Sequence, residues 1–134
     1  MLAKKLNPIL NVSNILESFS WFEKLGWEKS WDWGEPPTFG GACSGECMIF
    51  LCENGQGGRD KSSMKMTSGP EGNDAAEKGV WMSIWVDDVD AVHQHCIAQG
   101  LEVTWPPTDE PWMVREMHVR HPDGHVFRIS QARE

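Results

Sequence analysis

The alternation of apolar and polar residues near the start of the chain repeats in its second half. Residues 7–31 align without a gap over residues 81–105, and both segments begin with the period-two alternation typical of a β-strand. Identical residues are few, but the order of apolar, polar and glycine positions is shared. The similarity predicts the same elements in both segments. The apolar positions of the two predicted strands are Pro8, Leu10, Val12, Met82, Ile84 and Val86.

A helix is predicted after each of these strands. In the first segment Asn14, with a glutamate three residues later, forms the pattern of a capping box, and Gly26 supplies the left-handed residue that ends many helices. In the second segment Asp87 or Asp88 is a suitable N-cap, and Gly100 is the matching terminator. The apolar stripe of the first helix consists of Ile15, Leu16, Phe19, Phe22 and Leu25.

Further strands complete each segment. They are predicted at residues 27–33 and 46–52 in the first segment and at residues 101–105, 115–120 and 125–131 in the second. The second segment therefore has the order βαβββ, and the similarity of the first segment to it predicts an α+β fold built from two βαβββ modules. We expect one domain, with modules at residues 1–52 and 80–134. Residues 53–79 are rich in glycine, serine and charge, and are predicted to form a long, mobile loop.

The charge of the chain narrows its possible partners. The 134 residues include 20 acidic and 12 basic side chains, so the formal net charge is −8. An acidic chain is poorly suited to neutralise the phosphates of a nucleic acid or an anionic membrane surface. Cationic or neutral small molecules are the partners that this balance favours. Eight of the aromatic residues are tryptophans and none is a tyrosine.

The chain is expected to work in the cytoplasm. Its first residues contain two lysines but no apolar run long enough for a secretion signal, and no segment approaches the roughly 20 apolar residues of a membrane span. Without a secretion signal, the cysteines are predicted to be thiols in a reducing compartment. They are Cys43, Cys47, Cys52 and Cys96.

Several short motifs, in their order and spacing, resemble a known family. These are WFxxLGW at residues 21–27, VDDV at residues 86–89 and HPDGH at residues 121–125. Together with the duplicated βαβββ order, they resemble the glyoxalase/bleomycin-resistance/extradiol-dioxygenase superfamily, also called the vicinal oxygen chelate superfamily. The resemblance implies that the two modules form curved mixed sheets around a cleft.

A narrower likeness is to the bleomycin-resistance proteins. The run EPWMVRE at residues 110–116, followed by RHPDG at residues 120–124, is similar to two of their segments. Here Met113 and Val114 replace a single glycine, and His121 replaces an aspartate. The likeness implies a homodimer with two ligand clefts at its interface. An open sheet on each module also favours a two-fold dimer with an interface upwards of roughly 2,000 Å².

The resemblance also implies where a divalent metal would bind in the enzymes of the superfamily. Its four ligand positions correspond here to Asn7, Ile49, Trp81 and Arg128. None of these is a histidine, glutamate or aspartate, and a catalytic metal needs about three protein ligands. We therefore expect no metal and no other cofactor.

Two other groups of residues are candidate metal ligands, a set of histidines and a pair of cysteines. Three histidines, His118, His121 and His125, lie close together in the sequence, and we predict that they are surface and turn residues rather than ligands. The pair Cys43 and Cys47 has no second cysteine or histidine pair nearby that would complete a zinc site.

Strand alternation assigns a set of side chains to the concave side of the sheets, opposite the helices. Indole faces stack on planar rings and attract cations, so tryptophans on this side predict a site for a planar ligand. Arg128 would face an anionic or carbonyl group, and the acids at the rim would attract a positive ligand. The predicted ligand-binding residues are Asn7, Trp31, Trp33, Trp81, Ser83, Trp85, Trp105, Trp112 and Arg128. The rim acids are Asp32, Glu35, Asp109, Glu110 and Glu116.

Three functions follow from these patterns. The first is a metal-free binding protein that sequesters a planar, cationic antibiotic or other natural product, with no catalytic residue. The second is a lyase or dioxygenase of the superfamily with a displaced metal site. The third is a divergent member whose cleft serves another metabolite or a protein partner. The lost ligand positions and the tryptophans count against the second, and the sequence leaves the first and third open.

Overall fold

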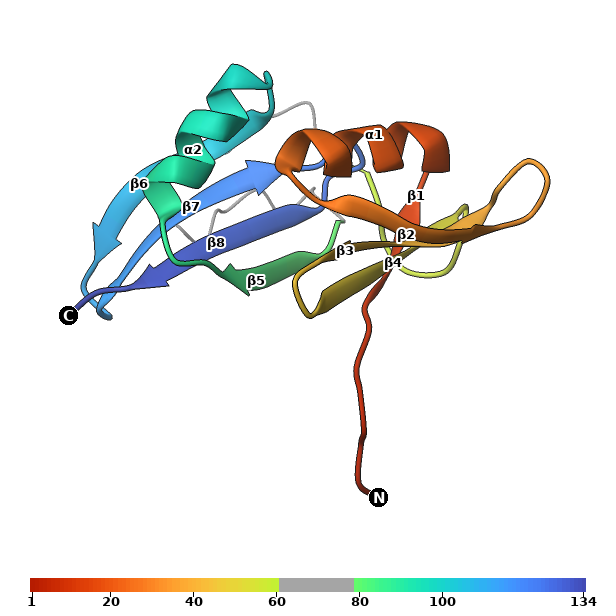
Figure 1. The fold of residues 1–134 in the computed structure, drawn as a ribbon, viewed down its shortest axis with the longest axis horizontal. Coiled ribbons are helices and arrows are strands. Elements are labelled where there is room, and N and C mark those ends of the chain that lie inside the picture. The colour runs from red at the N-terminus through yellow and green to blue at the C-terminus, as the bar shows by residue number, and fades with distance from the viewer. Residues whose placement is uncertain (61–78) are drawn as a thin grey trace. The chain divides into compact units, whose positions relative to one another are not determined.

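Two four-stranded mixed sheets, each with one helix, form the computed structural model, which describes residues 1–60 and 79–134 (Figure 1). The chain separates into two units, residues 1–57 and 58–134. The first unit contains β1 (Ile9–Val12), α1 (Ile15–Leu25), β2 (Glu28–Trp33), β3 (Phe39–Ser44) and β4 (Cys47–Glu53). The second contains β5 (Trp81–Trp85), α2 (Val89–Ala98), β6 (Glu102–Glu110), β7 (Val114–Arg120) and β8 (Val126–Ala132). The predicted α+β fold with two βαβββ modules is confirmed. Residues 61–78 of the predicted loop lie outside the described residues.

Both sheets have the same topology. The strand order is β1-β4-β3-β2 in the first unit and β5-β8-β7-β6 in the second. In each sheet the first strand pairs in parallel with the last, and the other neighbours are antiparallel. A parallel pair needs a crossover connection, and in each unit the crossover begins with the helix.

The predicted helix ends are confirmed. Asn14 has an extended backbone, and its side-chain oxygen accepts a hydrogen bond from the Glu17 amide at 3.0 Å. Asp88 accepts from the Ala91 amide at 3.0 Å in the same way. Gly26 ends α1 with φ of 102°, a conformation that favours glycine, and its amide donates to carbonyls of the last turn. Gly100 follows the last residues of α2 with φ of 72°.

Each helix covers one face of the sheet in its own unit. The predicted apolar stripe of α1 is buried except for Leu16, which is exposed. In the first unit the stripe packs with Leu10, Val12, Ala42, Ile49 and Leu51 of the sheet. In the second unit the buried residues are Val89 and Cys96 of α2 with Met117, Val119, Phe127 and Ile129 of the sheet. Apolar burial of this kind is the main source of stability in each unit.

The strand predicted at residues 101–105 is longer than expected. In the structure β6 continues through Pro106 and Pro107 to Glu110. Proline cannot donate to a ladder, and β6 accommodates the pair because it lies at the edge of its sheet and its register shifts between Trp105 and Thr108.

The prediction that the three histidines are surface and turn residues holds only in part, because His121 and His125 flank a turn but none of the three lies on the surface. His118, His121 and His125 are all fully buried. The turn at residues 121–125 accounts for the burial of His121 and His125, because their imidazoles point inward and accept backbone hydrogen bonds. The Asp123 amide donates to Nδ1 of His121 at 2.9 Å, and the Val80 amide donates to Nδ1 of His125 at 3.0 Å.

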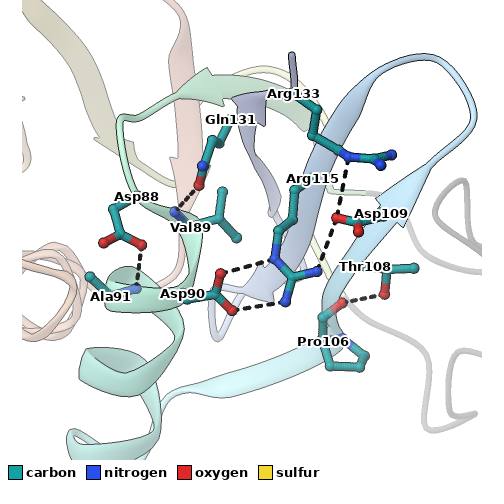
Figure 2. A network of polar contacts seen from close by, with 10 residues as sticks. All are labelled: Asp88, Val89, Asp90, Ala91, Pro106, Thr108, Asp109, Arg115, Gln131 and Arg133. Carbon is teal, nitrogen blue, oxygen red and sulfur yellow. Dashed lines mark hydrogen bonds and ion pairs between the residues drawn. The ribbon is translucent and has the colours of Figure 1, made fainter.

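A polar network joins the start of α2 to the sheet (Figure 2). The Val89 amide donates to the Gln131 side chain at 2.8 Å. Arg115 forms two hydrogen bonds with Asp90, both of 2.9 Å, and a third of 3.1 Å with Asp109. Arg133 lies 3.6 Å from Asp109. One predicted rim acid, Asp109, belongs to this network and is paired with both arginines. Among residues 1–60 and 79–134, no helix is long and apolar enough to cross a membrane.

A glycine in β3 permits the close packing of α1. A Cβ at Gly40 would lie 2.6 Å from the Phe19 ring and 2.7 Å from the Trp31 carbonyl oxygen. We expect Gly40→Ala to lower the free energy of unfolding by about 1–3 kcal/mol, the range for overpacking a core. The neighbouring Gly41→Ala is the matched control, because its Cβ meets only the partly exposed Trp31 ring, which can move. Urea unfolding of both variants measures the difference. Equal losses would contradict the packing described.

The Arg115 network makes a prediction about pH. Hydrogen bonding to Arg115 holds the pKa of Asp90 below its ordinary value. Since the folded-state pKa is the lower one, the contribution of Asp90 to stability is present above the unfolded pKa and is lost as pH falls through the folded pKa. An NMR titration of the Asp90 carboxyl group should therefore show a depressed midpoint that rises in Arg115→Gln. An unchanged midpoint in the variant would show that Arg115 is not the cause.

Candidate functional site

The face of each sheet that its own helix does not cover is the candidate site, here called the open face. Strand register shows which residues share a row across it. In the second unit one row consists of Ser83, Arg128, His118 and Trp105. The matching row in the first unit consists of Ile9, Phe50, Gly41 and Trp31. Trp31 and Trp105 therefore occupy equivalent positions. The charged and polar residues in the row of the second unit have apolar counterparts in the row of the first unit.

The open face of the first unit is filled by its own aromatic side chains. Trp31 lies 5.3 Å from Phe39 and 5.3 Å from Phe50, measured between ring centroids. Gly41 leaves room for this ring, because a Cβ there would lie 2.7 Å from the indole nitrogen. Trp33, at the end of β2, is 71% exposed. The side-chain amide of Asn7 donates a hydrogen bond to the Met48 carbonyl at 3.0 Å, and this bond joins the residues before β1 to β4.

A buried ion pair lies on the open face of the second unit. Glu116 is fully buried, and both of its carboxylate oxygens accept from Arg128, one from Nε and one from Nη2 at 2.9 Å. The Arg128 side chain stays 26% exposed. The Nε2 atom of His118 lies 3.8 Å from the same carboxylate. The prediction that Glu116 is a rim acid is therefore wrong. The alternation of strand β7 places it beneath Arg128 instead.

Two tryptophans contact the exposed side of this pair. The Arg128 Cζ atom lies 5.6 Å from the ring centroid of Trp81 and 5.7 Å from that of Trp112, both within cation–π range. Trp81 comes from β5 and is 46% exposed, and Trp112 comes from the β6–β7 turn and is 45% exposed. That turn is held by the Met113 amide, which donates to the Glu110 carbonyl at 3.2 Å. We call Trp81, Trp112, Arg128 and Glu116 the cation cluster.

The other predicted residues of the second unit border the cation cluster or lie apart from it. Ser83 is exposed and pairs in register with Arg128. Trp85 is 63% exposed and pairs with Ser130. Trp105 is partly buried, and within the described part of the chain its buried indole nitrogen has no hydrogen-bond acceptor. Arg128 is predicted to face an anionic or carbonyl group of a ligand, and in the structure two of its three guanidinium nitrogens are bound to the Glu116 carboxylate.

The residues at the inherited metal positions do not fit a divalent cation. One position needs correction, because Ile49 is buried on the helix-covered face and Phe50 is the true counterpart of Arg128. The hairpin before β4 turns over two residues and that before β8 over five, so counting from the glycine in each turn gives the wrong register. The corrected set offers an amide, two aromatic rings and a guanidinium, which is no ligand set for a metal. Residues 1–60 and 79–134 contain no cluster of three or more candidate metal ligands.

One polar residue of the open face, His118, is not among the ligand-binding residues predicted from the sequence. His118 lies between Trp105 and Arg128 in the row, and its ring centroid is 5.9 Å from that of Trp81. The alternation of Glu116, His118 and Arg120 with Met117 and Val119 places it on the same face as Arg128. The period-two rule that correctly placed β5 would have found it.

Solved structures with the same fold share little sequence with this chain. TioX from Micromonospora sp. ML1 has a TM-score of 0.72 at 16% identity, over 96% of this chain and 99% of that one. A bleomycin-binding protein complexed with bleomycin has a TM-score of 0.66 at 14% identity, over 96% and 98%. A bleomycin resistance determinant encoded on the transposon Tn5 has a TM-score of 0.68 at 14% identity, over 97% and 98%. These likenesses show the fold alone. The curated proteins contain no match to the chain.

The family match covers almost the whole chain. The sequence model of the Glyoxalase/Bleomycin resistance protein/Dioxygenase superfamily matches residues 5–129, a range that includes the candidate site. The resemblance predicted from the sequence motifs is thereby confirmed. The chain belongs to the Glyoxalase/Bleomycin resistance protein/Dioxygenase superfamily.

Proposed function

We propose that the protein binds a planar, cationic small molecule at the cation cluster without a metal, and thereby sequesters an antibiotic or another natural product. The observation that carries this proposal is the contact of two half-exposed tryptophans with one planar cation, the Arg128 guanidinium. Exposed indoles held against a delocalised cation already have the geometry that a planar cationic ligand needs.

Electrostatics supports the same choice of ligand. The formal net charge of −8 attracts cations at long range. The carboxylate at the base of the cation cluster adds a short-range preference for positive charge, because a buried acid is stable only beside a cation. The names of two structural neighbours mention bleomycin, a natural product, and this agrees with the proposed class of ligand.

The binding residues that we propose are those of the second unit around the cation cluster, with Ser83, Trp85 and Trp105 at its border. On the first unit, the residues that we propose are Trp31, Trp33 and Asn7 of its own open face. Of these, Trp31 packs against its own sheet, so Trp33 is the better placed to meet a ligand.

We also propose that the protein is a homodimer. Large apolar side chains are exposed on both units, and they include Ile9, Trp33, Trp85 and Met113. Such side chains are commonly covered by a partner in oligomers. Sedimentation at micromolar concentration should give twice the chain mass of 15.1 kDa. A monomer at that concentration would contradict the dimer without bearing on ligand binding.

Ligand binding is tested by removing one indole. We expect Trp112→Ala to weaken the binding of metal-free bleomycin by about 1–3 kcal/mol, or roughly fivefold to 150-fold, because an aromatic anchor is lost. A fluorescence titration measures the affinity, and treatment of the protein with a chelator should leave it unchanged.

The control is Trp21→Phe. Trp21 is buried in α1, so this variant removes an indole from the spectrum without touching the cation cluster. It should bind as tightly as the parent. If bleomycin and other planar cations all fail to bind the parent, the proposed function is wrong. If Trp112→Ala binds as tightly as the parent, the cation cluster is not the site.

A further inference from the structure

We propose that the Arg128 guanidinium is an internal occupant of the ligand position, and that a planar, delocalised cation binds by displacing it from Glu116. This inference rests on the proposed function and deepens it, since it specifies what the ligand must replace. It follows from the position of the guanidinium, which uses both indoles and the carboxylate at once.

The first step concerns the charge that must be replaced. Glu116 is fully buried, and the groups found against its carboxylate are Arg128 and, at 3.8 Å, Nε2 of His118. If a neutral ligand displaced Arg128, it would remove the bidentate partner of a buried carboxylate, and an anionic ligand would add repulsion. Both outcomes carry a large free-energy penalty. Only a cation can take the place of Arg128 without that penalty.

The second step concerns which member of the pair moves. Glu116 lies within β7, which has a hydrogen-bonded strand on each side, and its side chain is enclosed. The Arg128 side chain is long and partly exposed, and its neighbour on β5 is the small, exposed Ser83. Arg128 can therefore swing toward solvent along Ser83, while Glu116 stays in place as the counter-ion.

The third step concerns the shape of the cation. A guanidinium group is flat, spreads its charge over three nitrogens and offers parallel N–H donors that match the two oxygens of a carboxylate. Amidinium groups and guanidinium groups share this geometry, whereas an ammonium group is a compact, strongly hydrated charge. The ligand class inferred is thus a molecule that carries an amidinium, a guanidinium or a similar planar cation.

Benzamidine, which is an amidinium ion near neutral pH, is the first probe. If Arg128 competes with the ligand, Arg128→Ala should bind benzamidine at least about tenfold more tightly than the parent. In the parent only the fraction of molecules with Arg128 displaced can bind, whereas in the variant every molecule has an open site. Calorimetric titration of both proteins measures this change. If Arg128 instead contacts the ligand, the same variant binds more weakly, and that result would overturn the inference.

Chemical rescue is the second measurement. Arg128→Ala leaves Glu116 without its partner and should lower the thermal unfolding midpoint. Methylguanidinium chloride at low millimolar concentration should restore part of that loss, whereas methylammonium chloride at the same concentration should not. Arg115→Ala is the matched control, because Arg115 is likewise paired with carboxylates, those of Asp90 and Asp109, but on the exposed α2 network (Figure 2). Equal rescue of both variants, or rescue of neither, would refute the proposal.

A third variant covers the case in which Arg128→Ala does not fold. Arg128→Lys keeps a positive charge beside Glu116 but lacks the planar group, so it should bind benzamidine more tightly than the parent. Unchanged or weaker binding would count against the inference. These probes are independent of the natural ligand. Failure of bleomycin and every other planar cation to bind the parent, with benzamidine binding gained in the variants, would reject the proposed function and keep the displacement of Arg128.

Discussion

In each unit the first strand pairs in parallel with the last, and most of the open face depends on this pairing. It places β8 inside its sheet, between β5 and β7, although β8 is the last strand of the chain. A residue at the middle of β8 therefore has neighbours on both sides, Ser83 on β5 and His118 on β7. Arg128 occupies that position and can reach a tryptophan on one side and a carboxylate on the other. At a sheet edge it would have neighbours on one side only.

The charged row of the second unit is not needed to form the fold. The first unit builds the same sheet with Phe50 at the position of Arg128 and Gly41 at the position of His118. An apolar row is thus sufficient for the topology, as expected from the general finding that buried ion pairs are poor sources of stability. Comparison of the two units therefore indicates that Glu116 and Arg128 determine the properties of the open face and are not required for the sheet to form.

Local rules predicted most elements of the chain, although no strand was predicted where β3 lies. The period-two alternation located β1 and β5, and short-range signals such as Asn14, Asp88 and Gly26 located the helix ends, because each depends on residues a few positions apart. The errors came from longer-range geometry. Ile49 was misassigned because two hairpin turns differ in length, and that difference is visible only in the strand register.

Burial was the other source of error in the candidate site. Glu116 and the three histidines have polar side chains, and polar residues are mostly exposed in proteins. Each is buried here with a specific partner, such as Arg128 for Glu116 or the Val80 amide for His125. Pairings of this kind form between strands, so the sequence of one strand cannot reveal them. Trp81 and Trp112 are exposed as predicted, whereas the pairing of their common neighbour Arg128 with Glu116 was not predicted.

A single missing side chain makes the two halves of this duplicated protein unequal. Gly41 leaves room for the Trp31 ring over its own sheet, where the ring contacts Phe39 and Phe50. The equivalent position in the other half is His118, and there the tryptophans remain partly open to solvent. Duplication of a module ordinarily supplies two equal binding faces. In this chain the aromatic rings of the first unit fill its own open face, so under the function that we propose each polypeptide binds one planar cation, at the cation cluster.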